Sequence, residues 1–410
     1  MSEFFNVLPP NKALQVLLDR LDHQVEREAI PTHQALGRVT AEDITASEDL
    51  PRFPRSTMDG YSVRSSDTFG ASEGMPAYLD VVGEVPMGKS PRVDLSAGQA
   101  AGAFTGGMLA RGADAVVIVE NTQTVDDSTI EVLRPAASGE NVVQIGEDVR
   151  SGDPVLPTGH VIRAPDIGGL LALGITKVLV SKRPRVAIVS TGDELVSPGV
   201  DPGPGQIRDI NTYTISALVD KAGGLPKSVA VVHDDYEAQR AAAIDGLNQG
   251  DILVFSAGSS VSSRDMTASV IASLGSPGVL VHGISLKPGK PTIVALVERK
   301  PAFGLPGNPV SASVVFDLLI RPTIYALSGC MSPPEPPSVQ ARLLRDIPSL
   351  AGREDYVQVR LIHSEDELTA EPVFGKSNLI YTLVRADGAV KVPLDKGGLY
   401  AGEEVKVRML

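Results

Sequence analysis

Cysteine is nearly absent from this chain of 410 residues, whose only cysteine is Cys330. No intrachain disulfide can form, and one cysteine among six scattered histidines excludes a thiolate zinc site. Long apolar runs are also missing: the longest candidate, residues 167–180, is interrupted by Lys177 and falls short of the roughly 18 residues that span a membrane. The first residues lack the basic and apolar segments of a signal peptide. We therefore expect a reducing, cytoplasmic setting without direct membrane insertion.

Positive charge is scarce too, because 37 Lys and Arg residues stand against 50 Asp and Glu residues, a formal net charge of −13. Nucleic-acid binding depends on clustered basic side chains, so we expect no nucleic-acid partner. Any anion-binding site must be built locally, against this overall charge. The hydrophobic content of 42% is that of an ordinary soluble globular protein, and the length predicts two to four domains.

The composition and spacing of residues change along the chain. These changes predict a multidomain fold that combines α/β and all-β parts. Apolar residues at helical spacing predict an amphipathic helix over residues 11–22. Short β-branched runs separated by Gly and Pro predict an all-β insert, and a stiff Pro-rich linker precedes a second all-β region. The expected segments are an N-terminal helix region (1–26), a mixed linker domain (27–45 and 137–181), a β-rich insert domain (46–136), an α/β domain (182–330) and a C-terminal all-β domain (331–410).

From residue 185 a regular alternation of strands and helices begins. Short apolar runs predict strands, and the stretches between them have helical periodicity. This alternation predicts a mostly parallel sheet with crossover helices. The expected strands are residues 186–189, 228–232, 252–255, 279–284, 292–297 and 302–304, and the expected helices are residues 212–222, 236–247, 265–274 and 309–327.

Polar turns follow three of the expected strands, at residues 190–194, 256–260 and 305–311. In open α/β sheets, ligands bind beyond the carboxyl ends of the strands. The second and third turns lead into expected helices, whose first N–H groups can bind an anion. Asn308 suits a helix cap, and Pro309 suits the first helical position. Any one of these could be only a well-capped turn, but the three together favour a ligand site.

Two lysines, Lys287 and Lys290, flank a Pro-Gly turn. Pro followed by Gly suits a type II turn, and two ammonium groups on one rigid turn predict an oxyanion clamp. The alternative is a solvated basic loop. The spacing from Gly283 to Gly289 and the presence of Pro291 exclude a Walker phosphate loop. No Gly-x-Gly-x-x-Gly motif follows a strand in the required context, which argues against a dinucleotide enzyme.

Acidic residues stand near several predicted strand ends. Asp193, Asp234 and Asp265 could converge there, and magnesium commonly takes one or two carboxylates together with substrate phosphates. Most acidic residues are only surface charges, so this metal site is a hypothesis. His233 lies beside Asp234 and Asp235, where a histidine is more often structural than catalytic, and we assign it no role.

A set of motifs together carries a resemblance to one family. They are MDGY at 58–61, FTGG at 104–107, GED at 146–148, STGDEL at 190–195, GQIRDIN at 205–211, LKPGKP at 286–291 and GLPGNPVSA at 304–312. In order and spacing they resemble the molybdopterin molybdenumtransferase (MoeA) family, which includes the E domain of gephyrin. The resemblance covers nearly the whole chain, and GLPGNPVSA with LKPGKP upstream is its most specific part.

The resemblance implies an elongated homodimer with a catalytic α/β domain of the adenylylating molybdopterin-binding type. The N-terminal helix would pack on this domain, and the C-terminal region would form a small β-barrel. The active site would lie between the α/β domain and barrel of one subunit and the β-rich insert of the other. The family reaction takes adenylylated molybdopterin (molybdopterin-AMP) and molybdate, with Mg²⁺ as cofactor, and yields molybdenum cofactor and AMP.

Individual roles are also implied by the resemblance. The molybdate-binding residues would be Lys287, Lys290, Ser311, Arg353 and Ser377. The magnesium ligands would be Asp193, Asp234 and Asp265. The catalytic residues would be Asp59, Asp148, Asp234, Asp265, Lys287 and Lys290, with Asp59, Thr105 and Asp148 reaching the site in trans. The residues that bind the organic substrate would be Thr105, Thr191, Gly192, Glu194, Asp209, Asn211, Gly258, Ser259, Ser260, Pro306, Gly307, Asn308 and Pro309.

One turn departs from the family's commonest form. Ala257 and Ser262 stand where glycines are usual, and a Cβ there could crowd a phosphate. This leaves room for an alternative function, a gephyrin-like dimeric scaffold that binds the cytoplasmic segment of a membrane receptor, with or without residual transferase activity. A further alternative is the molybdopterin adenylyltransferase of the preceding step, which needs only the α/β domain. For a transferase, that adenylyltransferase and the molybdoenzymes that receive the cofactor would be protein partners.

Overall fold

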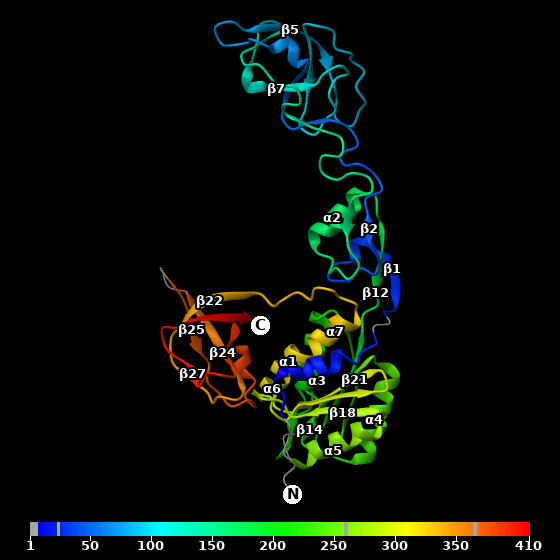
Figure 1. The fold of residues 1–410 in the computed structure, drawn as a ribbon, viewed down its shortest axis with the longest axis vertical. Coiled ribbons are helices and arrows are strands. Elements are labelled where there is room, and N and C mark those ends of the chain that lie inside the picture. The colour runs from blue at the N-terminus through cyan, green and yellow to red at the C-terminus, as the bar shows by residue number, and fades with distance from the viewer. Residues whose placement is uncertain (1–6, 23–24, 258–260, 364–366) are drawn as a thin grey trace. The chain divides into compact units, whose positions relative to one another are not determined.

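The computed structural model describes residues 7–22, 25–257, 261–363 and 367–410, without the side chains of 261–264 (Figure 1). Contacts divide the chain into two compact units. The first comprises residues 1–42, 158–163 and 177–410, and holds the α/β region together with the C-terminal all-β region. The second comprises residues 43–157 and 164–176, and holds the β-rich insert.

A six-stranded sheet forms the centre of the α/β region. Its order is β16-β13-β17-β21-β20-β18, and the first four strands run parallel, as the alternation of strands and helices predicts. β20 runs antiparallel to both of its neighbours, β21 and β18. The connection between β20 and β21 is too short for a crossover, which fixes the antiparallel direction of that pair. The strands are β13 (Arg185–Thr191), β16 (Leu225–Val232), β17 (Ile252–Ala257), β18 (Pro277–His282), β20 (Ile293–Val297) and β21 (Lys300–Pro306); two smaller pairs are β1 (Arg27–Pro31) with β12 (Lys177–Ser181), and β14 (Leu195–Val196) with β15 (Ile207–Arg208).

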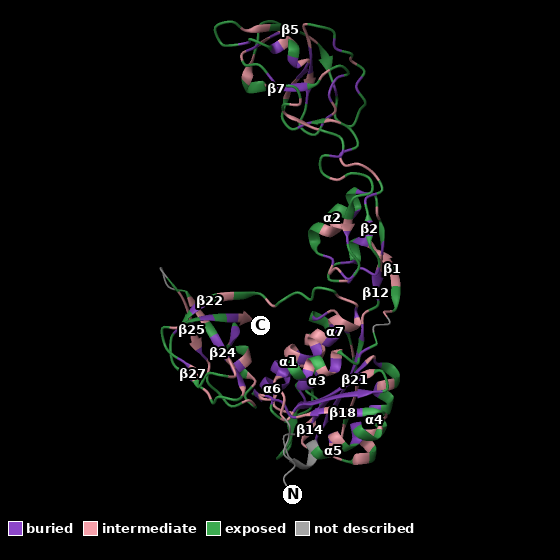
Figure 2. Ribbon diagram, in the orientation of Figure 1, coloured by how far each residue is buried: buried purple, intermediate pink, exposed green. Residues whose placement is uncertain are grey.

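Helices cover both faces of this sheet. Side chains alternate along β13, so that Val186 and Ile188 belong to one buried cluster, whereas Ala187 and Val189 belong to the other. The first cluster includes residues of α1, α3 and the segment 309–327, and the second includes residues of α4 and α5. Figure 2 shows the buried strands between helices with exposed outer sides. The helices are α1 (Pro10–Leu18), α3 (Asn211–Lys221), α4 (Tyr236–Gln249), α5 (Val261–Ser273), α6 (Pro309–Val315) and α7 (Arg321–Leu327), with a π-helical turn, η4 (Phe316–Ile320), between the last two.

The segment Pro309–Leu327 is long and apolar enough to cross a membrane by length and composition. This segment carries two charged residues, Asp317 and Arg321, so it is not an uninterrupted apolar run. The apolar window of this segment is 56% buried inside the protein, where Val315, Leu319 and Ile320 belong to the α/β core. Packing in this core accounts for its apolar character.

An ion pair links the start of β13 to the residue before β17. Arg185 donates to Asp251 from Nε at 3.1 Å and from Nη2 at 2.8 Å. Burial raises the pKa of Asp251, but the hydrogen bonds and charge of Arg185 outweigh it, so the pKa lies below its ordinary value.

We expect Asp251→Asn to lower the free energy of unfolding at pH 7 by about 1 kcal/mol, a value limited by solvent screening because the side chain of Asp251 is 37% exposed. A depressed folded-state pKa stabilises the protein above the unfolded value of about 3.9, and this contribution is lost as the pH falls through the folded value. Urea unfolding of both proteins at several pH values checks this. A difference that grows as the pH falls would contradict it.

The C-terminal region forms a closed β-barrel. Its strands follow the order β24-β25-β22-β28-β26, and a further pairing of β26 with β24 closes the ring. Val359, Ala370 and Val407 are among the buried residues that fill it. One more strand, β19, pairs with β24 although it comes from the α/β region. The elements are β19 (Leu286–Lys287), β22 (Ser338–Leu343), β23 (Ile347–Pro348), β24 (Glu354–His363), β25 (Leu368–Pro372), α8 (Tyr381–Val384), β26 (Gly388–Val392), β27 (Gly398–Leu399) and β28 (Glu404–Met409).

The second unit is built mainly of strands, as its β-branched runs predict. A curled sheet of order β7-β4-β6-β5-β9-β8 packs around Val63, Leu79 and Ile130. The sheet comprises β4 (Gly60–Val63), β5 (Ala77–Glu84), β6 (Gln99–Ala103), β7 (Ala115–Ile118), β8 (Thr122–Thr124) and β9 (Thr129–Val132). The remaining elements are the pairs β2 (Ile44–Thr45) with β11 (Pro154–Leu156) and β3 (Arg55–Ser56) with β10 (Val142–Val143), and the helix α2 (Ala164–Ala172).

Candidate active site

The turn between Lys287 and Lys290 is attached to the barrel. β19 pairs in parallel with β24, which places Lys287 beside Asp355. Glu354 N–H also donates to Ser285 O at 2.9 Å. Gly289 within the turn has a φ of 125°, a positive value that favours glycine. The turn thus begins in a strand of the barrel sheet, which anchors its Lys287 end.

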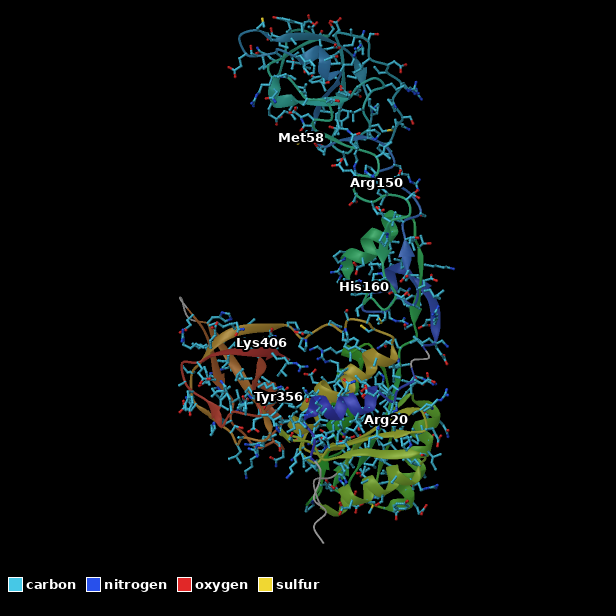
Figure 3. All side chains as sticks on the ribbon, viewed as in Figure 1. Arg20, Met58, Arg150, His160, Tyr356 and Lys406 are labelled. Atoms are coloured by element: carbon cyan, nitrogen blue, oxygen red, sulfur yellow. The ribbon has the colours of Figure 1, made fainter. Side chains whose placement is uncertain are left out.

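All of the predicted oxyanion-binding residues line one cavity of about 930 Å³ between the α/β region and the barrel. Lys287 and Lys290 come from the turn just described, and Ser311 lies in the first turn of α6. Arg353 precedes β24, and Ser377 follows β25. The structure therefore brings together residues from both regions, and their role in binding an oxyanion stays a prediction. Tyr356, labelled in Figure 3, also lines this cavity and packs against the α/β core.

Two charged residues of the cavity were missed by sequence reasoning. Lys376 adds a cation, and Asp355 adds a carboxylate whose side chain is only 2% exposed. Asp355 accepts a hydrogen bond of 2.8 Å from Arg353 Nε and lies 3.6 Å from Lys287 Nζ. Lys376 is adjacent to Ser377, and Asp355 lies two residues after Arg353. Proximity to these predicted residues is the sequence signal that could have identified them. Four cationic side chains and this carboxylate line the cavity.

Asn308 connects this cavity to a second one, because it lines both. Its side chain does not cap α6 as expected; Nδ2 donates instead to Ser377 Oγ at 3.0 Å. Val310 N–H donates to Ser377 O at 3.1 Å, while Pro309 occupies the start of the helix as predicted. A contact with the barrel thus replaces the local cap, which ties the start of α6 to the barrel loop.

The second cavity, of about 390 Å³, lies at the carboxyl ends of β13, β17 and β21. Among the residues that the structure describes, Thr191 Oγ1 and Asn211 Oδ1 are buried without a hydrogen-bond partner. Buried polar atoms normally have partners, so these two oxygens are available to a ligand or to water. The predicted substrate-binding residues that line this cavity are Thr191, Glu194, Asp209, Asn211, Gly307, Asn308 and Pro309.

The other predicted substrate-binding residues of the α/β region lie nearby or outside the description. Pro306 lines the larger cavity. Gly192 has a φ of 153°, a backbone conformation that L side chains rarely adopt, so this turn favours glycine. Gly258, Ser259 and Ser260 are outside the described residues, as is the side chain of Ser262. Ala257, the other departure from the family form, is buried in β17 opposite Pro306.

Asn211 ties two turns of the second cavity together. Its Nδ2 donates to Ser256 Oγ at 2.9 Å and to Gly307 O at 2.8 Å. We expect Asn211→Ala to weaken AMP binding about tenfold, because the turns lose two hydrogen bonds and the ligand loses an acceptor. Calorimetric titration with AMP measures this. Asn211→Asp, which keeps the shape but loses the N–H donors, should weaken binding similarly; wild-type affinity in both variants would contradict the assignment.

Two of the predicted magnesium ligands lie together. Asp193 Oδ1 is 2.9 Å from His233 Nδ1 and accepts a hydrogen bond of 3.2 Å from Asp234 N–H. The hydrogen bond with His233 lowers the pKa of Asp193, whereas burial, with repulsion from Asp193 and Glu194, raises the pKa of Asp234. Asp265 is an exposed residue of α5. Within the described residues, no group of three or more His, Cys, Asp or Glu is arranged to hold a metal ion.

The remaining predicted residues belong to the second unit. Asp59 Oδ1 accepts hydrogen bonds from Thr105 N at 2.8 Å and from Thr105 Oγ1 at 3.0 Å. Both bonds lower the pKa of Asp59, which keeps this exposed carboxylate ionised. Asp148 is also exposed, and its N–H donates to Leu50 O at 3.0 Å. Asp59 and Thr105 therefore form a hydrogen-bonded pair, and Asp148 is not a member of that pair.

Comparison with known proteins gives a consistent result along the chain. Residues 8–174 match a family model described as the MoeA N-terminal region (domain I and II), residues 187–326 match a probable molybdopterin binding domain, and residues 340–410 match the MoeA C-terminal region (domain IV). The molybdopterin molybdenumtransferase of Nostoc is 33% identical, over 96% of this chain and 91% of that protein.

Two further relatives extend the similarity to archaea and to solved structures. A putative molybdopterin biosynthesis protein of Methanocaldococcus jannaschii is 34% identical, over 99% of this chain and 98% of that protein. The crystal structure of a molybdopterin biosynthesis moeA protein from Pyrococcus horikoshii OT3 is 31% identical, with a TM-score of 0.85, over 99% of this chain and all of that chain. Sequence and fold therefore agree over essentially the whole length.

Proposed function

The chain belongs to the molybdopterin molybdenumtransferase (MoeA) family, and on this premise we propose that it inserts molybdate into adenylylated molybdopterin and releases AMP. Relatives that carry the transferase name match more than nine tenths of the chain. The comparisons give no support to the gephyrin-like scaffold alternative. The adenylyltransferase alternative needs only the α/β region, and leaves the matched first and last regions without a purpose.

The observation that carries the proposal is the meeting of two cavities at Asn308. The larger cavity offers the cations of Lys287, Lys290 and Arg353 to an oxyanion such as molybdate, with the hydroxyls of Ser311 and Ser377 beside them. The smaller cavity offers unpartnered buried oxygens to the nucleotide end of the substrate. Binding in adjacent cavities would hold molybdate beside the adenylylated pterin, so the protein contributes positioning and charge stabilisation at the phosphoryl group.

The carboxylates Asp193 and Asp234 would hold Mg²⁺ at the nucleotide end. The donor set fits a hard cation, because both are carboxylates and Mg²⁺ takes its remaining ligands from substrate phosphates and water. Burial raises the pKa of Asp234, and repulsion from Asp193 and Glu194 raises it further; a bound cation would relieve that repulsion. Mg²⁺ would neutralise phosphate charge there. Asp265 remains a proposed third ligand on the basis of the family resemblance.

We expect Asp234→Asn to raise the Mg²⁺ concentration needed for half-maximal AMP release about tenfold, because one anionic ligand is lost. The matched control is Asp235→Asn. Asp235 is the neighbouring carboxylate, and it caps α4 by accepting a 2.9 Å hydrogen bond from Ala238 N–H, which asparagine can also accept. Titration of activity with MgCl₂ measures both variants. Equal shifts in the two variants would contradict a specific role of Asp234.

The second unit would complete the site from another subunit of a homodimer. The resemblance to the family is the basis for bringing Asp59, Thr105 and Asp148 to the site in trans. The hydrogen bonds of Thr105 to Asp59 support this role, since they keep an exposed carboxylate ionised and oriented. The adenylyltransferase that makes the substrate and the molybdoenzymes that receive the cofactor are the proposed protein partners, in the cytoplasm.

Complementation tests the proposed function in cells. A bacterial strain without its own molybdopterin molybdenumtransferase should regain the activity of a molybdenum-dependent enzyme when this chain is expressed. The control is a chain with Lys406→Ala, a barrel lysine that does not line either cavity of the site. No restored activity from abundant, folded protein would contradict the proposed function.

A further inference from the structure

We propose that Asp355 is a positioning residue of the oxyanion subsite, which holds Arg353 and Lys287 in the geometry that receives a tetrahedral anion. The inference rests on the proposed function, because it concerns the cavity that would bind molybdate. It adds a residue whose own charge is of the wrong sign to bind an anion.

The burial of Asp355 requires cationic partners. Its side chain is 2% exposed, and an unpaired carboxylate in such a place is strongly unfavourable. Arg353 supplies Nε at 2.8 Å from Oδ1 and Nη2 at 3.3 Å from Oδ2, and Lys287 Nζ lies 3.6 Å from Oδ2. The side chains of Arg353 and Lys287 are 31% and 57% exposed, and both line the cavity. One buried carboxylate therefore contacts two cations that a ligand can reach.

These contacts fix the direction of the remaining donors. A guanidinium group carries five N–H donors in one plane, and the two bonds to Asp355 fix that plane while leaving the others available. The parallel pairing of β19 with β24 places Lys287 beside Asp355 along the backbone as well. Asp355 thus joins the arginine of the barrel to the lysine of the α/β region at the wall of the cavity.

The sign of the effect separates positioning from simple electrostatics. A carboxylate in the wall of an anion site repels the anion, so its removal should tighten anion binding if charge alone matters. If Asp355 acts by holding Arg353 and Lys287, its removal should weaken binding although the cavity becomes more positive. The two explanations therefore predict opposite changes.

Calorimetric titration of the full-length protein with sodium molybdate, and separately with AMP, tests the inference. We expect Asp355→Asn to weaken molybdate binding about tenfold, in the range found when supporting hydrogen bonds of bound ions are removed, and to leave AMP binding unchanged. Glu371→Gln is the matched control. Glu371 is also a barrel carboxylate contacted by two cations, Arg345 and Arg360, but it lines neither cavity, so this variant should bind molybdate normally.

A double-mutant cycle identifies the residue through which Asp355 acts. Arg353→Gln combined with Asp355→Asn should bind molybdate more tightly than the product of the two separate losses predicts, because both changes remove the same interaction. If Asp355→Asn does not fold, Asp355→Glu provides the test, since it keeps the charge but moves it, and should also weaken molybdate binding. Unchanged or tighter binding by the folded variant would overturn the inference alone. A wild-type protein that binds no molybdate would overturn the proposed function as well.

Discussion

Lys290→Ala should lower kcat/KM for molybdate about 100-fold in the AMP-release reaction, the scale of effect seen when one charged donor is removed from a preorganised anion site. Lys290 is the more important of the two lysines on the turn. Lys287 lies 3.6 Å from Asp355, so part of its charge is already compensated. In the described part of the chain, the ammonium group of Lys290 has no carboxylate partner, so its charge is free for a ligand.

The control for this prediction is Lys406→Ala. Lys406, labelled in Figure 3, is a lysine of the barrel that pairs with Glu335 at 3.9 Å and lines neither cavity of the site. An exposed pair of this kind contributes little, so the control should stay within about twofold of the wild type. Steady-state rates over a series of molybdate concentrations give both values. An unchanged molybdate dependence in Lys290→Ala would remove Lys290 from the oxyanion site.

Gly289→Ala should reduce activity about as strongly, because a displacement of reacting groups by roughly 1 Å can lower a rate about 100-fold. Gly289 has a φ of 125°, a conformation that side chains disfavour. A Cβ there would lie 2.7 Å from the Val315 side chain and 2.9 Å from that of Leu286. The turn must move to relieve these contacts, and Lys287 and Lys290 move with it. We also expect a loss of about 2–4 kcal/mol in the free energy of unfolding.

Gly402→Ala separates backbone strain from collision. Gly402 lies in a turn of the barrel with a φ of 85°, and a Cβ there would meet nothing within 4 Å. This variant should lose about 1 kcal/mol of stability and keep its activity. Urea unfolding and AMP-release assays on both variants provide the comparison. If Gly289→Ala is no less active than Gly402→Ala, the geometry of the lysine turn does not control the reaction.

The regular elements of the α/β region follow from local patterns. The run at 252–255 predicts β17 because it is apolar throughout, as strands buried on both faces are. The antiparallel direction of β20 could not be read from periodicity, which is the same for both directions, although the short connection to β21 determines it. The helix α1 ends at Leu18 rather than at residue 22. Leu21 still packs in the core, so the apolar spacing predicts a longer helix than the one that forms.

Site residues that belong to sequence motifs could be predicted. Site features that depend on tertiary contacts were harder to predict. Lys287, Lys290 and Ser311 stand in recognisable turns, and they meet at one cavity. The pairing of β19 with β24 involves a strand of two residues and a partner far along the chain, so no local signal indicates it. Local sequence predicts that Asn308 caps α6. Its side chain instead bonds to Ser377 of the barrel, a long-range contact that has no local signal.

We propose that this protein uses molybdate to release AMP from adenylylated molybdopterin. The most direct measurement is a single-turnover reaction of excess purified protein with molybdopterin-AMP and MgCl₂, in which AMP is followed with and without molybdate. We expect rapid AMP release that requires molybdate and reaches one AMP per substrate. AMP release at the same rate without molybdate, or no release from protein that binds the substrate, would contradict it.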